Sequence, residues 1–137
     1  MPDTALQNIA HKMPKMGSRV HATFDFAIAG AFLAAGAIFF SRNNKRTALG
    51  AALCGTATLA VSVLTDYQGQ GKKHISYPSH SNVHTGLAAM AATMPTLLDF
   101  ADENEARFFR AAAAAGSFMG IATDYEGKKK KKLPENE

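Results

Sequence analysis

The sequence predicts an all-α protein, a four-transmembrane-helix bundle built from two homologous helical hairpins. Four apolar segments alternate with polar ones, and the clearest, residues 47–65, contains no charge, no His and no Pro. Nearly the same pentapeptide, T-D-Y-Q-G at 65–69 and T-D-Y-E-G at 123–127, follows the second and the fourth apolar segment. Small residues fill these segments where a soluble helix would carry a charged stripe. Together these patterns favour lipid-embedded helices in two related pairs.

The repeated pentapeptide also predicts the organisation of the chain. Val-His opens the first and the third apolar segment, at 20–21 and 83–84, so each copy reads as apolar segment, polar turn, apolar segment and TDY. Two copies are too few for a solenoid but suit a compact bundle. The predicted order is a cytoplasmic N-terminal segment (1–19), a first hairpin repeat (20–69), a cytoplasmic loop (70–82), a second hairpin repeat (83–127) and a basic C-terminal tail (128–137).

The first hairpin has the length that a bilayer requires. A span needs roughly 20 mostly apolar residues. Residues 47–65 meet this requirement, and residues 26–41 are free of charge, so the first span is long enough if His21 and Asp25 lie near its end. Gly50 and Gly55 are expected to face other helices, because small residues let helices approach closely in lipid.

The second hairpin is shorter. Residues 83–98 contain one ionisable side chain, His84, and include Pro95, which disfavours a helix interior. Residues 111–123 carry no charge, and Gly116 and Gly120 form a small-xxx-small pair expected to pack against another helix. A soluble four-helix bundle is the alternative, but it requires a charged stripe that residues 48–64 lack.

Basic residues predict the orientation in the membrane. Four spans place both termini and the central loop on one side, with ten Lys and Arg residues against five on the other. Because basic residues favour the cytoplasm, we expect a multi-pass protein of a bacterial inner membrane with both termini inside. The lysine run 128–132 is read as an anchor to anionic lipid. No aromatic residue interleaves that run, so no nucleic-acid partner is predicted.

This topology predicts one polar cluster at the cytoplasmic end of the bundle. It gathers His21, His84, Asp66 and Asp124, with Asp25 one helical turn inside and on the same face as His21. Three hypotheses stay open: ion pairs that fix how the hairpins dock, a proton or metal site centred on Asp25, and a haem held by His21 and His84.

Three further expectations concern residues near this cluster. An Asp after a helix carboxyl end opposes the helix dipole, so Asp66 is expected to have a cationic partner. His74 and His80 lie in the predicted central loop, lack the spacing of a structural zinc site and are expected to be exposed. Catalytic and phosphate-binding signatures are absent from the sequence, which predicts no enzyme activity, no catalytic residue, no metal ligand and no cofactor.

The second half of the chain resembles a known family. The stretch V-H-T-G-L-A-A-M-A-A-T-M-P-T-L-L-D-F-A-D-E-N-E-A-R-F-F-R, followed by A-G-S-F-M-G-I-A-T-D-Y-E, resembles the bacterial SPW-repeat-like small integral membrane proteins, and the resemblance covers roughly residues 19–127. The chain departs from the pattern at residues 94–96, where Met-Pro-Thr replaces Ser-Pro-Trp, and at Ala88, where a second Asp would stand. The resemblance implies a four-helix membrane protein and no established activity.

These patterns favour a non-enzymatic structural or accessory subunit of a larger membrane complex. Its expected partners are the lipid bilayer and other membrane subunits or a second copy of the chain. The alternative is a proton-, metal- or haem-linked transport or redox module that uses His21, Asp25 and His84.

Overall fold

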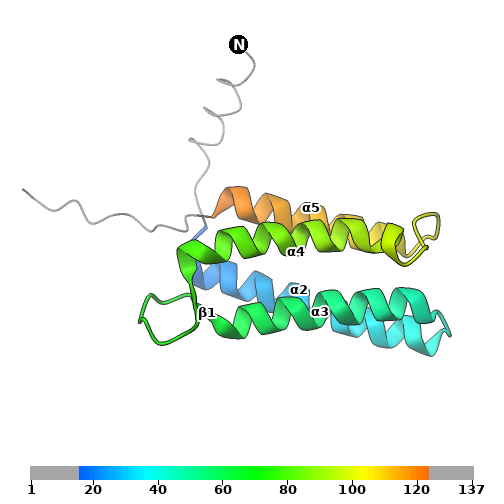
Figure 1. Cartoon of the computed structure of the whole chain (residues 1–137), viewed down its shortest axis with the longest axis horizontal. Coiled ribbons are helices and arrows are strands. Elements are labelled where there is room, and N and C mark those ends of the chain that lie inside the picture. Colours follow the sequence, from blue (N-terminus) through cyan, green and yellow to red (C-terminus); the bar gives the residue numbers. More distant parts are fainter. Residues whose placement is uncertain (1–15, 124–137) are drawn as a thin grey trace, which may run out of the picture.

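The structure, a computed structural model, describes residues 16–123 and is helical, as predicted (Figure 1). The elements in chain order are α2 (Ser18–Ser41), α3 (Lys45–Leu64), β1 (Thr65–Asp66), β2 (Ile75–Ser76), α4 (Tyr77–Leu97) and α5 (Ala106–Ala122). Two very short strands lie in the chain between the second and the third of the four described helices, which are α3 and α4.

The helices form two hairpins that pack as two layers, α2 with α3 and α4 with α5 (Figure 1). The tight turns of both hairpins lie together at one end of the bundle, here called the turn end. The starts of α2 and α4 and the ends of α3 and α5 lie at the other, here called the strand end. There β1 and β2 pair in parallel, and Met16 forms a parallel bridge with Thr123. Each hairpin therefore pairs the end of its last helix with the segment that precedes the other hairpin.

Two helix starts follow from local capping chemistry. Asn44 accepts a hydrogen bond from the backbone N–H of Thr47 and caps α3. Ser76 caps α4 in the same way by accepting from the N–H of Ser79, and a proline stands in the first turn, where its missing N–H costs nothing. Helix α4 thus begins at Tyr77, six residues before the expected start at residue 83.

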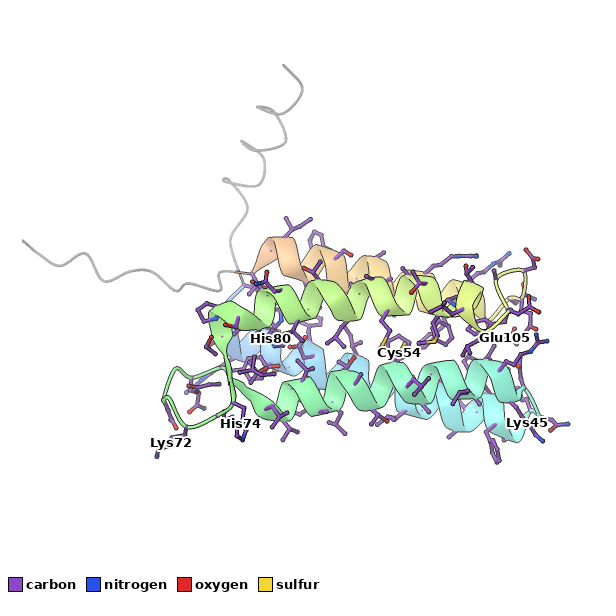
Figure 2. The ribbon with its side chains drawn as sticks, viewed as in Figure 1. Lys45, Cys54, Lys72, His74, His80 and Glu105 are labelled. Atoms are coloured by element: carbon purple, nitrogen blue, oxygen red, sulfur yellow. The ribbon has the colours of Figure 1, made fainter. Side chains whose placement is uncertain are left out.

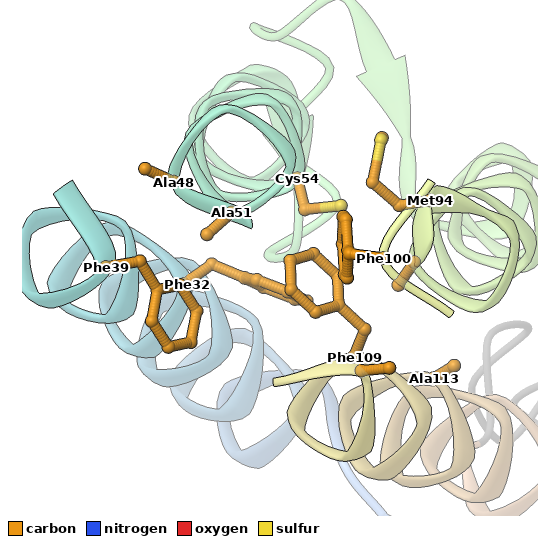
Figure 3. Close-up of a cluster of buried hydrophobic side chains, with 11 residues drawn as sticks. Phe32, Phe39, Ala48, Ala51, Cys54, Met94, Phe100, Phe109 and Ala113 are labelled. Carbon is orange, nitrogen blue, oxygen red and sulfur yellow. The ribbon is translucent and has the colours of Figure 1, made fainter. Parts of the chain in front are cut away.

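Aromatic rings fill the core toward the turn end, and side chains from all four helices meet on the bundle axis (Figure 3). Phe109 is fully buried, with its ring centroid 5.0 Å from that of Phe100 and 5.6 Å from that of Phe32. At the surface of this end, Arg46 pairs with Asp99 at 3.2 Å and ties the two turns together. At the strand end the packed rings are instead polar ones, since Tyr67 and Tyr77 contact each other and the ring of His80.

The four predicted packing glycines all face neighbouring helices. A Cβ at Gly55 would lie 2.9 Å from the side chain of Leu33, and one at Gly50 would lie 2.9 Å from Met94. The space around Gly116 and Gly120 is wider, because a Cβ there would lie 3.7 Å or 3.6 Å from its nearest neighbour. Close approach therefore needs glycine in α3 more than in α5.

Two helices, α2 and α3, are long and apolar enough to cross a bilayer, with mean hydropathies of 1.8 and 1.7 over their most apolar windows. Only 22% of the α2 window and 39% of the α3 window are buried within the bundle. Their outward faces expose large apolar side chains, among them Phe24, Phe26, Ile38, Phe40, Leu49, Leu53 and Val63.

Candidate metal centre

Four ionisable side chains converge in the interior at the strand end. His21 and Asp25 stand one turn apart on α2, and His80 and His84 stand one turn apart on α4. All four are buried, with exposed fractions of 0%, 2%, 1% and 6% in that order. One potential ligand atom from each side chain lies within 4.8 Å of the others, so the set can hold a metal ion.

The Asp25 carboxylate is the centre of this cluster. Its Oδ2 lies 3.2 Å from Nε2 of His21 and 3.0 Å from Nε2 of His80. Its Oδ1 lies 3.4 Å from Nε2 of His84. The three imidazoles thus point the same ring nitrogen, Nε2, at one carboxylate. The contacts of His80 and His84 with Asp25 join the two hairpins, and the contact of His21 lies within α2.

Two threonines set the ring orientation of His21 and His80. Nδ1 of His80 lies 2.8 Å from Oγ1 of Thr65, and Nδ1 of His21 lies 2.7 Å from Oγ1 of Thr123. Each hydroxyl already donates its hydrogen to the carbonyl oxygen four residues earlier in its own helix, at 2.6 Å. Because a hydroxyl has one hydrogen, each threonine must accept from the imidazole, and Nδ1 of both histidines carries the proton.

This assignment determines what Nε2 presents to Asp25. A neutral imidazole protonated on Nδ1 has a lone pair on Nε2. The lone pairs of His21 and His80 then face a carboxylate oxygen, which is also electron-rich. Either a proton on each Nε2 or a cation shared by all the groups must lie between them. A metal-binding imidazole commonly has this arrangement, with the metal on one nitrogen and an oriented hydrogen-bond acceptor on the other.

Tyr67 completes the surroundings of Asp25. Its hydroxyl donates to Oδ2 of Asp25 at 2.6 Å. Burial, together with the hydrogen bond and the charge of Asp25, raises the pKa of the Tyr67 hydroxyl, which therefore remains a donor. Thr65 and Tyr67 both belong to the first TDY sequence, which therefore contacts His80 through one side chain and Asp25 through the other.

The structure gathers three of the five residues expected in the polar cluster: His21, Asp25 and His84. Asp66 lies apart from them and accepts hydrogen bonds from the backbone N–H of Gln70 and of Gly71, at 3.0 Å and 2.6 Å. These bonds lower the pKa of Asp66, more than the charge of Lys73 does. The expected cationic partner is present only as the charge of Lys73, a smaller cause, because the Q-G-Q-G turn folds its amides back onto the carboxylate. Asp124 lies outside the described residues.

The expectation that His80 is exposed was wrong, whereas His74 is exposed in the loop as expected (Figure 2). The error came from starting the third helix at residue 83. The Ser-Tyr-Pro sequence at 76–78 signals a helix start, and a helix that begins there puts His80 and His84 on one face. The spacing His-x-x-x-His at 80–84 then matches His-x-x-x-Asp at 21–25.

Comparison of the chain with protein-family models, with curated proteins and with solved structures gives no match. The resemblance to SPW-repeat-like proteins therefore stays a prediction. The geometry of the strand end is what bears on function.

Proposed function

We propose that this protein is a small membrane protein that binds one divalent transition-metal ion between its two hairpins. The ligands are Nε2 of His21, His80 and His84 and the carboxylate of Asp25. The observation that carries the proposal is the orientation of two imidazoles by Thr65 and Thr123, which turns their Nε2 atoms toward the carboxylate.

The spacing of these atoms supports a tetrahedral ion. With bonds of about 2.0–2.1 Å, a tetrahedral Zn²⁺ ion keeps its ligand atoms about 3.3 Å apart. Nε2 of His21 and of His80 lie 3.2 Å and 3.0 Å from Oδ2 of Asp25, and Nε2 of His84 lies 3.4 Å from Oδ1. One ligand atom from each of the four side chains lies within 4.8 Å of the others, so small shifts bring the set to this spacing. Imidazole and carboxylate ligands suit Zn²⁺ and neighbouring transition ions, and four protein ligands are typical of a closed, non-catalytic site.

A single ion fits this arrangement better than a haem or a protonated cluster does. A haem would have to lie between His21 and His84, but their ring centroids are 5.0 Å apart and both rings point at the Asp25 carboxylate. A purely protonic cluster would place several imidazolium charges together in a buried site, which is costly. One divalent ion meets the four ligands at once and keeps the imidazoles neutral.

We further propose that all four helices lie in the membrane, with the strand end and both termini in the cytoplasm. The apolar outward faces of α2 and α3 support membrane insertion. Over the whole sequence, ten Lys and Arg residues belong to the termini and the central loop, against five in and beside the two tight turns, and this bias supports the orientation. Docking onto other membrane subunits, the role predicted from the small-residue helix faces, is compatible with a metal site and stays a prediction.

Metal binding is tested on the full-length protein purified in mild detergent. We expect one Zn²⁺ per chain by elemental analysis after loading and dialysis. Co²⁺ loading should give the visible absorption of a tetrahedral ion. Because an ion that binds only the folded state stabilises it by about 2.7 kcal/mol at one hundred times its Kd, Zn²⁺ should also raise the Tm.

The matched variants are His80→Ala and His74→Ala, which remove a buried and an exposed histidine six residues apart. We expect His80→Ala and Asp25→Ala to lose the bound ion and His74→Ala to keep it. Equal metal content in His80→Ala and His74→Ala, or no stoichiometric metal in the unaltered protein, would refute the proposal.

A further inference from the structure

A groove of about 640 Å³ runs between α4 and α5 at the strand end. His84 lines it, and the other three proposed ligands do not. A second, much smaller cavity of about 30 Å³ lies inside and is lined by Asp25 and again by His84. His84, Ala88 and Gly116 line both, so they form the boundary between the groove and the interior of the cluster.

Small residues keep this boundary thin. A Cβ placed at Gly120 would lie 3.6 Å from Nδ1 of His84, and one at Gly116 would lie 3.8 Å from Cε1 of the same ring. Any longer side chain at these positions would project toward the imidazole. The inner cavity has room for about one water-sized particle, since such a particle needs roughly 10–15 Å³.

The hydroxyl groups along the groove are oriented in a way that suits a cation. Thr85 donates to the carbonyl oxygen of Ser81, and Ser117 donates to the carbonyl oxygen of Ala113. Ser81 itself donates to the carbonyl oxygen of residue 78. With their hydrogens used within their own helices, these three hydroxyls present oxygen lone pairs to their surroundings, and oxygen lone pairs bind cations and their hydration water.

Charge distinguishes this groove from the other large cavity at the same end. That cavity, of about 620 Å³, is lined by three cations, Arg19, Lys72 and Lys73, and by one carboxylate, Asp66. Its net positive charge repels an approaching divalent cation. Among the described residues, none that lines the α4–α5 groove is a Lys, Arg, Asp or Glu.

We propose that the metal ion enters and leaves through the α4–α5 groove, past His84, and that the ion is therefore exchangeable. This inference rests on the proposed metal site. The oxygens of Ser81, Thr85 and Ser117 solvate the ion along the groove, and His84 is the first ligand that an entering ion meets.

The test measures exchange rates and affinity separately. Full-length protein in detergent is loaded with Co²⁺, and its release to excess chelator and its uptake are followed by stopped-flow absorbance. Ser117→Phe adds bulk at the exposed rim of the groove. We expect both rates to fall about tenfold, equivalent to a barrier about 1.4 kcal/mol higher, while the Kd from equilibrium dialysis is unchanged.

The matched control is Thr23→Phe, which adds the same bulk to the basic cavity and should leave both rates unchanged. Thr85→Phe, on the other wall of the groove, is a second blocking variant in case Ser117→Phe does not fold. Wild-type rates in the folded blocking variants, or slowing by Thr23→Phe alone, would overturn the route while leaving the metal site in place. Absence of Co²⁺ binding by the unaltered protein would instead overturn both proposals.

Discussion

At the scale of single residues, the threonines that end α3 and α5 determine which ring nitrogen of His21 and of His80 faces Asp25. The hydroxyl of Thr65 and that of Thr123 each accept a hydrogen bond from a histidine Nδ1 and donate one to a backbone carbonyl. Each ring is thus fixed to a helix backbone through one hydroxyl. A methyl group in place of that hydroxyl leaves the buried N–H without its acceptor. In the proposed metal site, the threonines are therefore positioning residues that act on the ion through His21 and His80.

This predicts the effect of Thr65→Val and of Thr123→Val. Loss of a hydrogen bond to the non-coordinating nitrogen of a ligand histidine typically lowers metal affinity by about 10–100-fold. We expect each variant to weaken Zn²⁺ binding by about that factor in a chelator competition assay. Thr93→Val is the control, because the Thr93 hydroxyl also bonds the carbonyl four residues earlier but is exposed. If Thr65→Val and Thr93→Val bind Zn²⁺ equally well, the threonines do not orient the ligands.

Sequence reasoning reached part of this site. An ionisable residue inside an apolar segment is a functional hypothesis by default, and this pointed to Asp25 together with His21 and His84. The hydroxyls of the TDY repeats were not recognised, because a threonine at a helix end has no signature of what it contacts. The partner of Tyr67 likewise has no sequence signature, and only the folded chain shows its hydroxyl on Asp25.

At the scale of elements, the hairpin α2–α3 depends on close contact at one glycine. A Cβ at Gly55 would lie 2.9 Å from Leu33 Cγ and 3.1 Å from the Leu33 backbone nitrogen, and the backbone cannot rotate away. We expect Gly55→Ala to destabilise the protein by about 1–3 kcal/mol, the usual cost of overpacking. The measurement is detergent thermal unfolding.

The control for this prediction is Gly30→Ala on the facing helix. Nothing lies within 4 Å of a Cβ there, so the variant should gain about 0.5–1 kcal/mol from the lower entropy of its unfolded chain. Equal effects of the two changes would show that helix propensity, and not helix contact, governs Gly55.

The helices themselves were predictable because each apolar run is long and bounded by polar turns. The two-residue strands β1 and β2 were not, since so short an element has no periodicity to detect. Their pairing nevertheless matters for the site, because it holds Thr65 beside the start of α4, where His80 lies. The same holds for Met16 and Thr123 at the start of α2.

At the scale of the whole molecule, the two hairpins interact reciprocally. The threonine that ends the first hairpin binds a histidine of the second, and the threonine that ends the second binds a histidine of the first. This favours a repeat register that pairs His21 with His80 and Asp25 with His84, in place of the register that pairs the two Val-His sequences. The proposed metal site takes two ligands from each hairpin, and one hairpin alone supplies too few ligands to hold the ion.

The last prediction concerns how this bundle crosses the membrane. Single cysteines replace Lys45, Lys72 or Asp102, which are all exposed, in a Cys54→Ala background. Residue 45 lies near the turn end and residue 72 lies in the loop at the strand end (Figure 2). Residue 102 lies in the turn between α4 and α5, also at the turn end. If all four helices span with the strand end inside, an impermeant thiol reagent added to intact cells should label residues 45 and 102 and spare residue 72. Disruption of the cells should then expose residue 72.

Labelling of residue 45 alone would show that only α2 and α3 cross the bilayer, as their hydropathy permits. Labelling of residue 72 in intact cells would reverse the orientation, and protection of all three until lysis would place the bundle wholly inside the cell. The proposed metal site lies at the strand end, so this experiment also determines which side of the membrane the site faces.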